Sequence, residues 1–228
     1  MKSMSKKSDY MKLIRSISMV AFASIMLLCM CMLSLPAAAK SELEAGIQAV
    51  QDKDADAALK HLKPLASKGN VVAQFQLGIL YADGRGVAQN PETAVGYFRA
   101  AAQHGYAPAQ SSMGIMHAFG KGVAQSDVEA SKWFRKAAEQ GNGNAQASLG
   151  LSYEDGLGVK KDPVEAVRWY RKAALQNVPE AQYSLALMYL KGLGVGRDEK
   201  QARAWLEKSA RLGSGPAKAL LENGLKLE

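Results

Sequence analysis

The sequence predicts an all-α protein, an α–α solenoid built from helix-turn-helix units with a period of 36 residues. The pair Ala73-Gln74 returns at that interval as Ala109-Gln110, Ala145-Gln146 and Ala181-Gln182. The motif Gly84-x-Gly86-Val87 recurs at the same interval. A fixed period in this range is typical of solenoids, in which each repeat packs only on its neighbours.

The first half of each repeat is expected to form a helix that ends at the glycine pair. In the first full copy, Ala73, Leu77 and Tyr81 fall on one side of a helix with about 3.6 residues per turn, so this side should pack inward. Gly84 stands where a helix would end in the left-handed conformation, which glycine adopts without steric cost. The helix should therefore stop here in every copy.

The second half of each repeat is expected to form a second helix. Asn90-Pro91 supplies an N-cap followed by proline at the first helical position, so this helix should run from there to about Gln103. Its apolar side carries Ala94 and Phe98. Three tryptophans recur at one position of this helix, and we interpret them as packing side chains: Trp133, Trp169 and Trp205.

The amino terminus has the pattern of a secretory signal peptide. Residues 1–16 are basic, residues 17–35 are apolar apart from three serines, and the small residues 37–39 follow. A charged start, an apolar run and small residues before a cut site describe such a signal. We expect cleavage after Ala39 and a periplasmic or secreted chain that begins at Lys40. The alternative is a retained membrane anchor, because an apolar run of 19 residues lies within the range of a spanning helix.

Charge and cysteine content narrow the function further. Cys29 and Cys31 both lie in the apolar run, so the mature chain would have no disulfide, no catalytic thiol and no cysteine metal ligand. The first 39 residues hold five of the 29 basic and one of the 21 acidic residues, which leaves a net charge of +4 on the mature chain. Because these charges are mixed in sign, we expect no nucleic-acid partner.

The mature chain divides into four full repeats between two capping segments. A partial opening repeat should serve as the amino-terminal cap, because an end repeat has one face in water. The final helix, expected to reach about Leu227, should serve as the carboxy-terminal cap. The predicted segments are the signal peptide 1–39, the first cap 40–70, the repeats 71–106, 107–142, 143–178 and 179–214, and the last cap 215–228.

The repeat resembles a known family. The pattern A-Q-x-x-L-G-x-x-Y-x-x-G-x-G-V, followed by an alanine, an aromatic residue, an alanine pair and a glycine, is similar to the Sel-one-like repeat (SLR), a relative of the tetratricopeptide repeat. The 36-residue period and the Gly-x-Gly-Val turn separate it from the 34-residue tetratricopeptide form. The resemblance implies hairpins stacked into a right-handed superhelix. Four positions depart from the pattern: His117 for a tyrosine, Asn177 and Ala186 for glycines, and Leu206 for an aromatic residue.

The other side of each first helix carries the candidate binding site. We expect this stripe to line the concave surface of the stack, and its apolar residues, varied from copy to copy, suit a bound peptide or helix. An alternative is that its four aliphatic residues pack between adjacent first helices as core. The candidate partner-binding residues are Phe75, Ile79, Asp83, Ser111, Ile115, Phe119, Leu151, Asp155, Tyr183, Leu187 and Lys191.

No group of residues has the pattern of a reaction centre. His61, His104 and His117 lie on three different copies without the spacing of a metal pair, and the mature chain has no Ser-x-x-Lys pair that could supply an acylating serine. We therefore expect no catalytic residue, no metal, no cofactor and no enzyme activity. The predicted function is a protein-binding scaffold or adaptor of the bacterial cell envelope, without a membrane span once the signal is removed. The family resemblance leaves one alternative, a hydrolase acting on β-lactam or cell-wall substrates.

Overall fold

The structure, a computed structural model, describes residues 37–226. These residues form eleven α-helices and no strand, which confirms the all-α solenoid of helical hairpins. Both cysteines and residues 1–36 of the expected signal peptide lie outside the described residues. The helices are α3 (Ala37–Gln51), α4 (Ala55–Ser67), α5 (Val71–Asp83), α6 (Pro91–Gln103), α7 (Ala107–Phe119), α8 (Asp127–Glu139), α9 (Gly143–Asp155), α10 (Pro163–Leu175), α11 (Pro179–Lys191), α12 (Glu199–Arg211) and α13 (Gly215–Glu222).

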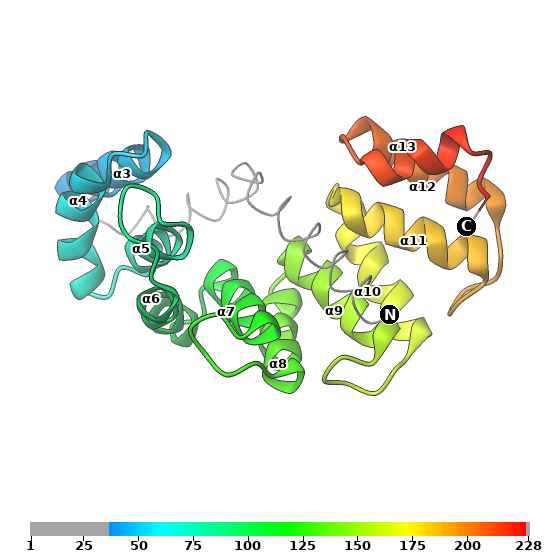
Figure 1. Ribbon diagram of the computed structural model, residues 1–228, viewed down its shortest axis with the longest axis horizontal. Helices are drawn as coiled ribbons and strands as arrows, with labels where there is room; N and C mark the ends of the chain where they lie inside the picture. Colours follow the sequence, from blue (N-terminus) through cyan, green and yellow to red (C-terminus); the bar gives the residue numbers. More distant parts are fainter. Residues whose placement is uncertain (1–36, 227–228) are drawn as a thin grey trace.

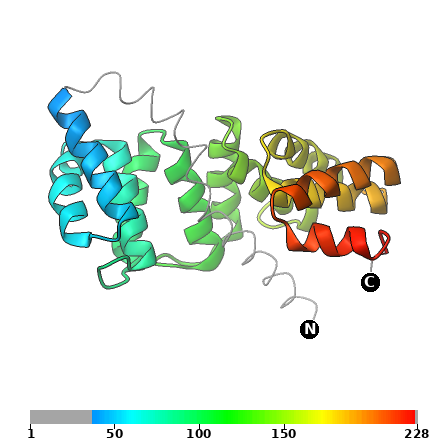
Figure 2. The same ribbon diagram turned by 90° about the horizontal axis from the view of Figure 1, so that it is seen from above.

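The helices follow one another along an arc. Each one packs chiefly on the helices next to it in sequence, as expected of a solenoid. Figure 1 shows α5, α7 and α9 on the inner side of the arc and α6 and α8 on its outer side. The helix directions also turn along the array: in Figure 2 the green helices stand upright, whereas the orange and red helices run across the view. The array is thus both curved and twisted.

Helix ends lie where the local sequence predicts them. The side chains of Asn90 and Asp162 accept hydrogen bonds from backbone N–H groups in the first turns of α6 and α10. The first helices α5, α7, α9 and α11 all end at a glycine in the left-handed conformation, as at Gly84 with φ 67° and Gly120 with φ 64°. At these helices the start or the stop is therefore encoded within a few residues, whereas α7 and α11 begin without a side-chain cap.

The second glycine of each turn is required by a contact between repeats. Gly158 lies against the start of α8 in the preceding repeat, and a Cβ atom on it would collide with the carbonyl group of Asp127. The hydroxyl of Ser131 also donates a hydrogen bond to the carbonyl oxygen of Gly158, at 3.3 Å. The turn of one repeat thus packs on the next-to-last helix before it, a contact that the turn motif alone does not predict.

A glycine and an aromatic ring pack together inside each of the first three full repeats. A Cβ atom on Gly78, Gly114 or Gly150 would lie 2.5–2.7 Å from a ring carbon of the residue 20 positions later. Those rings belong to Phe98, Phe134 and Tyr170. In the fourth repeat the corresponding residues are Ala186 and Leu206, both fully buried in one core cluster. Two of the departures from the repeat pattern therefore form one pair, because the smaller leucine leaves room for the alanine methyl group.

A buried glutamine ties each repeat to the preceding one. The side-chain amide of Gln110 donates to the carbonyl oxygen of Ala102, eight residues earlier, at 3.2 Å. The glutamines at the same position of the other three repeats make the same bond, at 3.0–3.1 Å. All four side chains are buried. The bond joins each first helix to the end of the preceding second helix, where the same carbonyl oxygen also accepts a backbone hydrogen bond, as from the N–H of Gly105 to Ala102 at 3.1 Å. The four glutamines are Gln74, Gln110, Gln146 and Gln182.

The three tryptophans pack as predicted, each with an added partner. Trp169 is buried, and Trp133 and Trp205 are partly buried against core clusters. In each case the ammonium group of the lysine three residues later lies over the ring, 4.1–4.5 Å from its centroid. This distance is within the range of cation–π attraction. A lysine side chain thus covers a face of each tryptophan ring.

The last helix is shorter than the sequence predicts. It ends at Glu222 rather than near Leu227, with Asn223 as its C-cap. Gly224 and Leu225 then adopt left-handed backbone conformations, with φ 64° and 65°. The prediction was wrong because the apolar spacing continues past the point where the backbone leaves the helix. Leu225 instead packs against the core cluster beneath α13.

Candidate functional site

The predicted stripe is the least covered side of the first helices. In α5, Phe75, Ile79 and Ala82 are half-buried and Asp83 is exposed, whereas most other residues of the helix are buried. In Figure 1 the helices α5, α7 and α9 lie on the inner side of the arc. These residues of α5 therefore keep part of their surface accessible.

The four aliphatic residues of the stripe belong partly to the core. Each is half-buried and packs against a cluster of fully buried residues within its own or a neighbouring repeat. One side of each residue therefore lies in the core, as the alternative predicts, while the other side remains accessible. These residues are Ile79, Ile115, Leu151 and Leu187.

The aromatic residues of the stripe differ in their surroundings. The Phe75 ring lies 5.8 Å from the Phe98 ring and 5.3 Å from the Tyr106 ring, in an edge-on arrangement with Tyr106. Tyr183 is half-buried against the last core cluster. Phe119, the last residue of α7, is half-buried. Each ring is therefore held by the fold while keeping part of its surface accessible.

Ser111 does not belong to the accessible stripe. Its side chain is only 6% exposed, although it occupies the same repeat position as Phe75 and Tyr183. A serine is too short to reach beyond its larger neighbours on the helix, so the neighbouring residues cover it. The expectation that Ser111 lines the surface is therefore corrected.

The end of each first helix carries a different side chain. Asp83 forms an ion pair with Arg85 of the following turn, with 2.6 Å between oxygen and nitrogen. The equivalent residues are Phe119, Asp155, which is half-buried, and Lys191, which is exposed. The stripe thus changes from acidic to aromatic to acidic to basic along the array, and a bound segment would meet a different group at each repeat.

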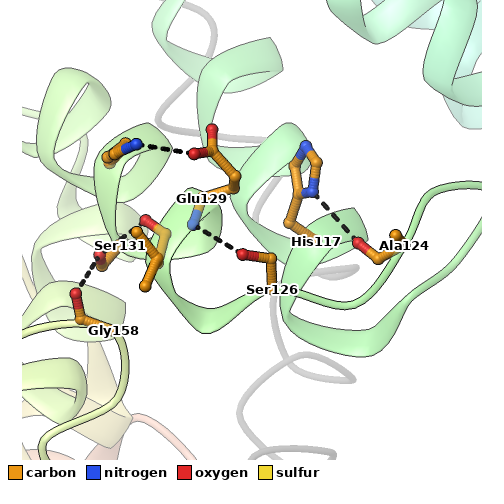
Figure 3. Close-up of polar contacts among 8 residues, drawn as sticks. His117, Ala124, Ser126, Glu129, Ser131 and Gly158 are labelled. Carbon is orange, nitrogen blue, oxygen red and sulfur yellow. Dashed lines mark hydrogen bonds and ion pairs between the residues drawn. The ribbon is translucent and has the colours of Figure 1, made fainter.

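His117 has a structural role in a turn. Figure 3 shows its ring directed at the carbonyl group of Ala124, and its Nδ1 atom lies 3.4 Å from that oxygen. In the same turn Ser126 caps α8 through a hydrogen bond from the backbone N–H of Glu129. The half-buried ring therefore lies between helix and turn, at the position that a tyrosine occupies in the other three repeats.

Arginines tie the tyrosines of this position to the preceding repeat. The guanidinium group of Arg135 donates to the hydroxyl of Tyr153 at 2.7 Å, and that of Arg171 donates to the hydroxyl of Tyr189 at 2.9 Å. In each pair the arginine lies 18 residues before the tyrosine. The sequence analysis missed these bonds, although the recurring 18-residue interval is a signal that could have revealed them.

Neither a metal centre nor a membrane-spanning helix is found among the described residues. Between residues 37 and 226, no three histidine, cysteine, aspartate or glutamate side chains are arranged so that they could bind a metal ion. Over the same residues, no helix is long and apolar enough to cross a membrane.

Comparison with known proteins identifies the repeats. The family model described as Sel1 repeat matches residues 36–70, 71–106, 107–142, 143–178 and 179–214. No curated protein sequence matches the chain. Among solved structures, c5321, a protective antigen present in uropathogenic Escherichia coli strains that displays an SLR fold, is 35% identical with a TM-score of 0.73. A Sel1 repeat protein from Oxalobacter formigenes is 37% identical with a TM-score of 0.66.

These likenesses extend over most of the chain. The alignment with c5321 covers 82% of this chain and 42% of that protein, and the alignment with the Oxalobacter protein covers 73% and 48%. The chain thus spans less than half the length of either structure. Five consecutive matches to the repeat model, together with these two structures, show that the chain belongs to the Sel1 repeat family.

Proposed function

We propose that this protein is a non-catalytic scaffold or adaptor of the bacterial cell envelope that binds a peptide or protein segment along the concave side of its solenoid. Repeats of this family generally mediate protein–protein interaction. The observation that carries the proposal is the half-exposed apolar stripe on the first helices, in which Phe75, Phe119 and Tyr183 keep accessible ring surface. An extended or helical segment with apolar side chains could bury these rings.

Export to the envelope is part of this proposal. It rests on the basic start, the apolar run and the small residues before Lys40. Cleavage after Ala39 would shorten α3 by three residues, of which Ala37 and Ala38 are exposed and only Ala39 packs against the core. The fold should therefore tolerate the cut. The related c5321 is a protective antigen, which suits a location where antibodies can reach it.

Identifying the first residue of the exported protein tests the proposal that the signal peptide is cleaved after Ala39. Mass spectrometry of protein recovered from the bacterial envelope should find Lys40 as the first residue. Recovery of the intact chain from the membrane fraction would contradict cleavage and would make the protein an anchored one.

Partner capture tests the binding surface. The mature chain would be used as bait in an envelope extract, beside a variant with Phe119→Ser and Tyr183→Ser. Large accessible aromatic rings often contribute most of the affinity at interfaces, so the variant should lose the captured partner. Because both rings are also partly buried, thermal melting of each variant must be recorded and capture compared well below the melting temperature.

A matched control separates this surface from general surface hydrophobicity. Val128 on α8 and Val164 on α10 are 50% and 63% exposed and lie on second helices. Their replacement by serine should leave capture unchanged. Normal capture by the folded Phe119/Tyr183 variant, or equal loss in the control, would rule out the concave stripe as the binding surface.

The proposal also excludes hydrolysis. The support comes from the sequence: the mature chain has no Ser-x-x-Lys pair, and its three histidines lie in three different copies of the repeat. Purified protein from Lys40 onward should not hydrolyse nitrocefin above background. Turnover that follows the protein through purification would overturn the non-catalytic assignment.

A further inference from the structure

The buried glutamines of the four repeats differ in what binds their oxygen atoms. In the second and third repeats the Oε1 atom accepts a hydrogen bond from a second glutamine 30 residues later: Gln140 binds Gln110 at 2.7 Å and Gln176 binds Gln146 at 2.8 Å. Each second glutamine is the C-cap residue of its helix, α8 or α10. In these two repeats the carboxamide of a second glutamine therefore satisfies the Oε1 atom of the buried glutamine.

The fourth repeat has no such carboxamide. Leu212 is the C-cap residue of α12, at the position of Gln140 and Gln176. Gln182 is only 1% exposed, and its Oε1 atom has no hydrogen-bond partner. An unpaired buried acceptor of this kind is unfavourable, because it has lost its hydrogen bonds to water without gaining a partner in the protein. The oxygen is therefore a strong site for any N–H donor that can reach it.

A pocket leads to this glutamine. It has a volume of about 310 Å³ and lies between the end of α10, α11 and α12. Leu175 and Leu212, which are 69% and 47% exposed, form apolar parts of its wall. Its volume falls at the lower end of the range for small ligand sites, large enough for one or two side chains.

The rim of the pocket is basic. Lys208 and Arg211, both exposed, line it, and the Lys208 ammonium group lies 4.2 Å from the centre of the Trp205 ring. None of the residues that line the pocket is acidic. In the third repeat the position of Arg211 is occupied by Leu175, so the pair of cations belongs to the fourth repeat. The site therefore combines a buried acceptor, apolar walls and two cations.

We propose that this pocket binds a protein segment in which an asparagine or glutamine carboxamide lies next to acidic residues. The carboxamide would donate to Gln182 Oε1, as the side chains of Gln140 and Gln176 do within the chain. Carboxylates on either side of it would pair with Lys208 and Arg211. The inference rests on the proposed protein-binding role, but it uses a site separate from the concave stripe.

Short peptides test the site by NMR. The probes are the acetylated and amidated tripeptides Glu-Gln-Glu, Glu-Leu-Glu and Lys-Gln-Lys, titrated into the isotope-labelled mature chain. Glu-Gln-Glu should shift the side-chain amide signals of Gln182 and the indole N–H of Trp205, in a saturable manner. The other two peptides should bind at least about tenfold more weakly, equivalent to roughly 1.4 kcal/mol.

The protein offers its own matched variant. Leu212→Gln should place a carboxamide against Gln182, as in the second and third repeats, and should abolish the response to Glu-Gln-Glu. This variant should fold, because glutamine already occupies the position twice in the array. The double variant Lys208→Gln/Arg211→Gln should bind Glu-Gln-Glu more weakly than the parent does. It should still bind Glu-Gln-Glu more tightly than Glu-Leu-Glu.

The outcomes separate this inference from the scaffold proposal. Equal binding of the glutamine and leucine peptides, no shift at Gln182, or unchanged binding by Leu212→Gln would each overturn the pocket assignment. None of these results depends on Phe119 or Tyr183. If the concave-stripe variant loses partner capture, the scaffold proposal is supported whatever the peptides show. If the variant still captures its partner, the peptide result for the pocket is unaffected.

Discussion

At the scale of single residues, backbone conformation gives the sharpest prediction. Gly120 has φ 64°, and a Cβ atom on it would lie 3.1 Å from the Cβ atom of Gln125. Gly120→Val should therefore lower the free energy of unfolding by about 1–3 kcal/mol, although the glycine makes no side-chain contact. Denaturant unfolding measures the change.

Gly96 provides the control for this substitution. It lies inside α6 without a positive φ, and a Cβ atom on it would meet nothing within 4 Å. Gly96→Ala should stabilise the protein by roughly 0.5–1 kcal/mol, because glycine is a poor residue in a helix interior. If both substitutions changed stability in the same direction, backbone conformation would not be the cause.

The buried phenol of Tyr170 should make the stability of the fold depend on pH. Its hydroxyl donates to Glu154 at 2.8 Å, and burial, followed by the nearby Glu154 carboxylate, raises the pKa of Tyr170 well above 10. The folded protein thus favours the neutral phenol, and the resulting stability is complete below pH 10 and is lost as the pH rises above it.

Tyr170→Phe should therefore behave differently at neutral and alkaline pH. The ring should fit, because phenylalanine occupies this position in two other repeats. At neutral pH the variant should lose about 0.5–1.5 kcal/mol with the hydrogen bond. Above pH 10 its stability should fall less steeply than that of the parent, as measured by denaturant unfolding across a pH series. Identical slopes would show that Tyr170 does not titrate in this way.

At the scale of the helical element, the pairing of glycine with an aromatic ring sets how closely two helices approach. Gly114→Ala would place a methyl group about 2.5 Å from the Phe134 ring, and overpacking of this kind typically costs about 1–3 kcal/mol. Phe134→Leu alone should also destabilise the protein, because the smaller side chain leaves a cavity.

The double variant should cost less than the two single variants together. It recreates the combination of Ala186 and Leu206, both of which are fully buried in the fourth repeat. The coupling measured in a double-mutant cycle should amount to about 0.5–3 kcal/mol. If the free-energy changes of the two single variants simply added, the alanine and the leucine of the fourth repeat would not compensate for each other through their contact.

At the scale of the whole molecule, contact between neighbours makes stability a local property. The last helix, α13, covers α12 through Ala217 and Leu220, and within the described residues it lies at the end of the array. A chain that ends at Ser214 should therefore lose hydrogen-exchange protection in α11 and α12 while keeping it in α5 to α8. Uniform loss of protection along the chain would indicate that the array unfolds as one cooperative unit.

The sequence by itself determined the repeat and most of its helix ends, although not the end of the last helix. The caps at Asn90 and Asp162 and the stop at Gly84 depend on bonds and backbone angles within a few residues, so the local sequence contains the information. The family could be predicted as well, because its repeat motif lies in the same short segments. The accessible side of the first helices could be predicted only in part, since Ser111 is buried. The binding role of that side remains a prediction.

Only the tertiary structure decided which atoms the neighbouring repeats cover. Leu80 and its equivalents Met116, Ser152 and Met188 are all at most 5% exposed, yet the helical pattern did not single them out as core. Ser111 is likewise buried, and the approach of the preceding repeat requires glycine at Gly158. The Gln182 oxygen in the fourth repeat, like that of Gln74 in the first, is left without a partner. Burial depends on distances between segments tens of residues apart, and these distances follow from the curvature of the stack, which no local pattern encodes.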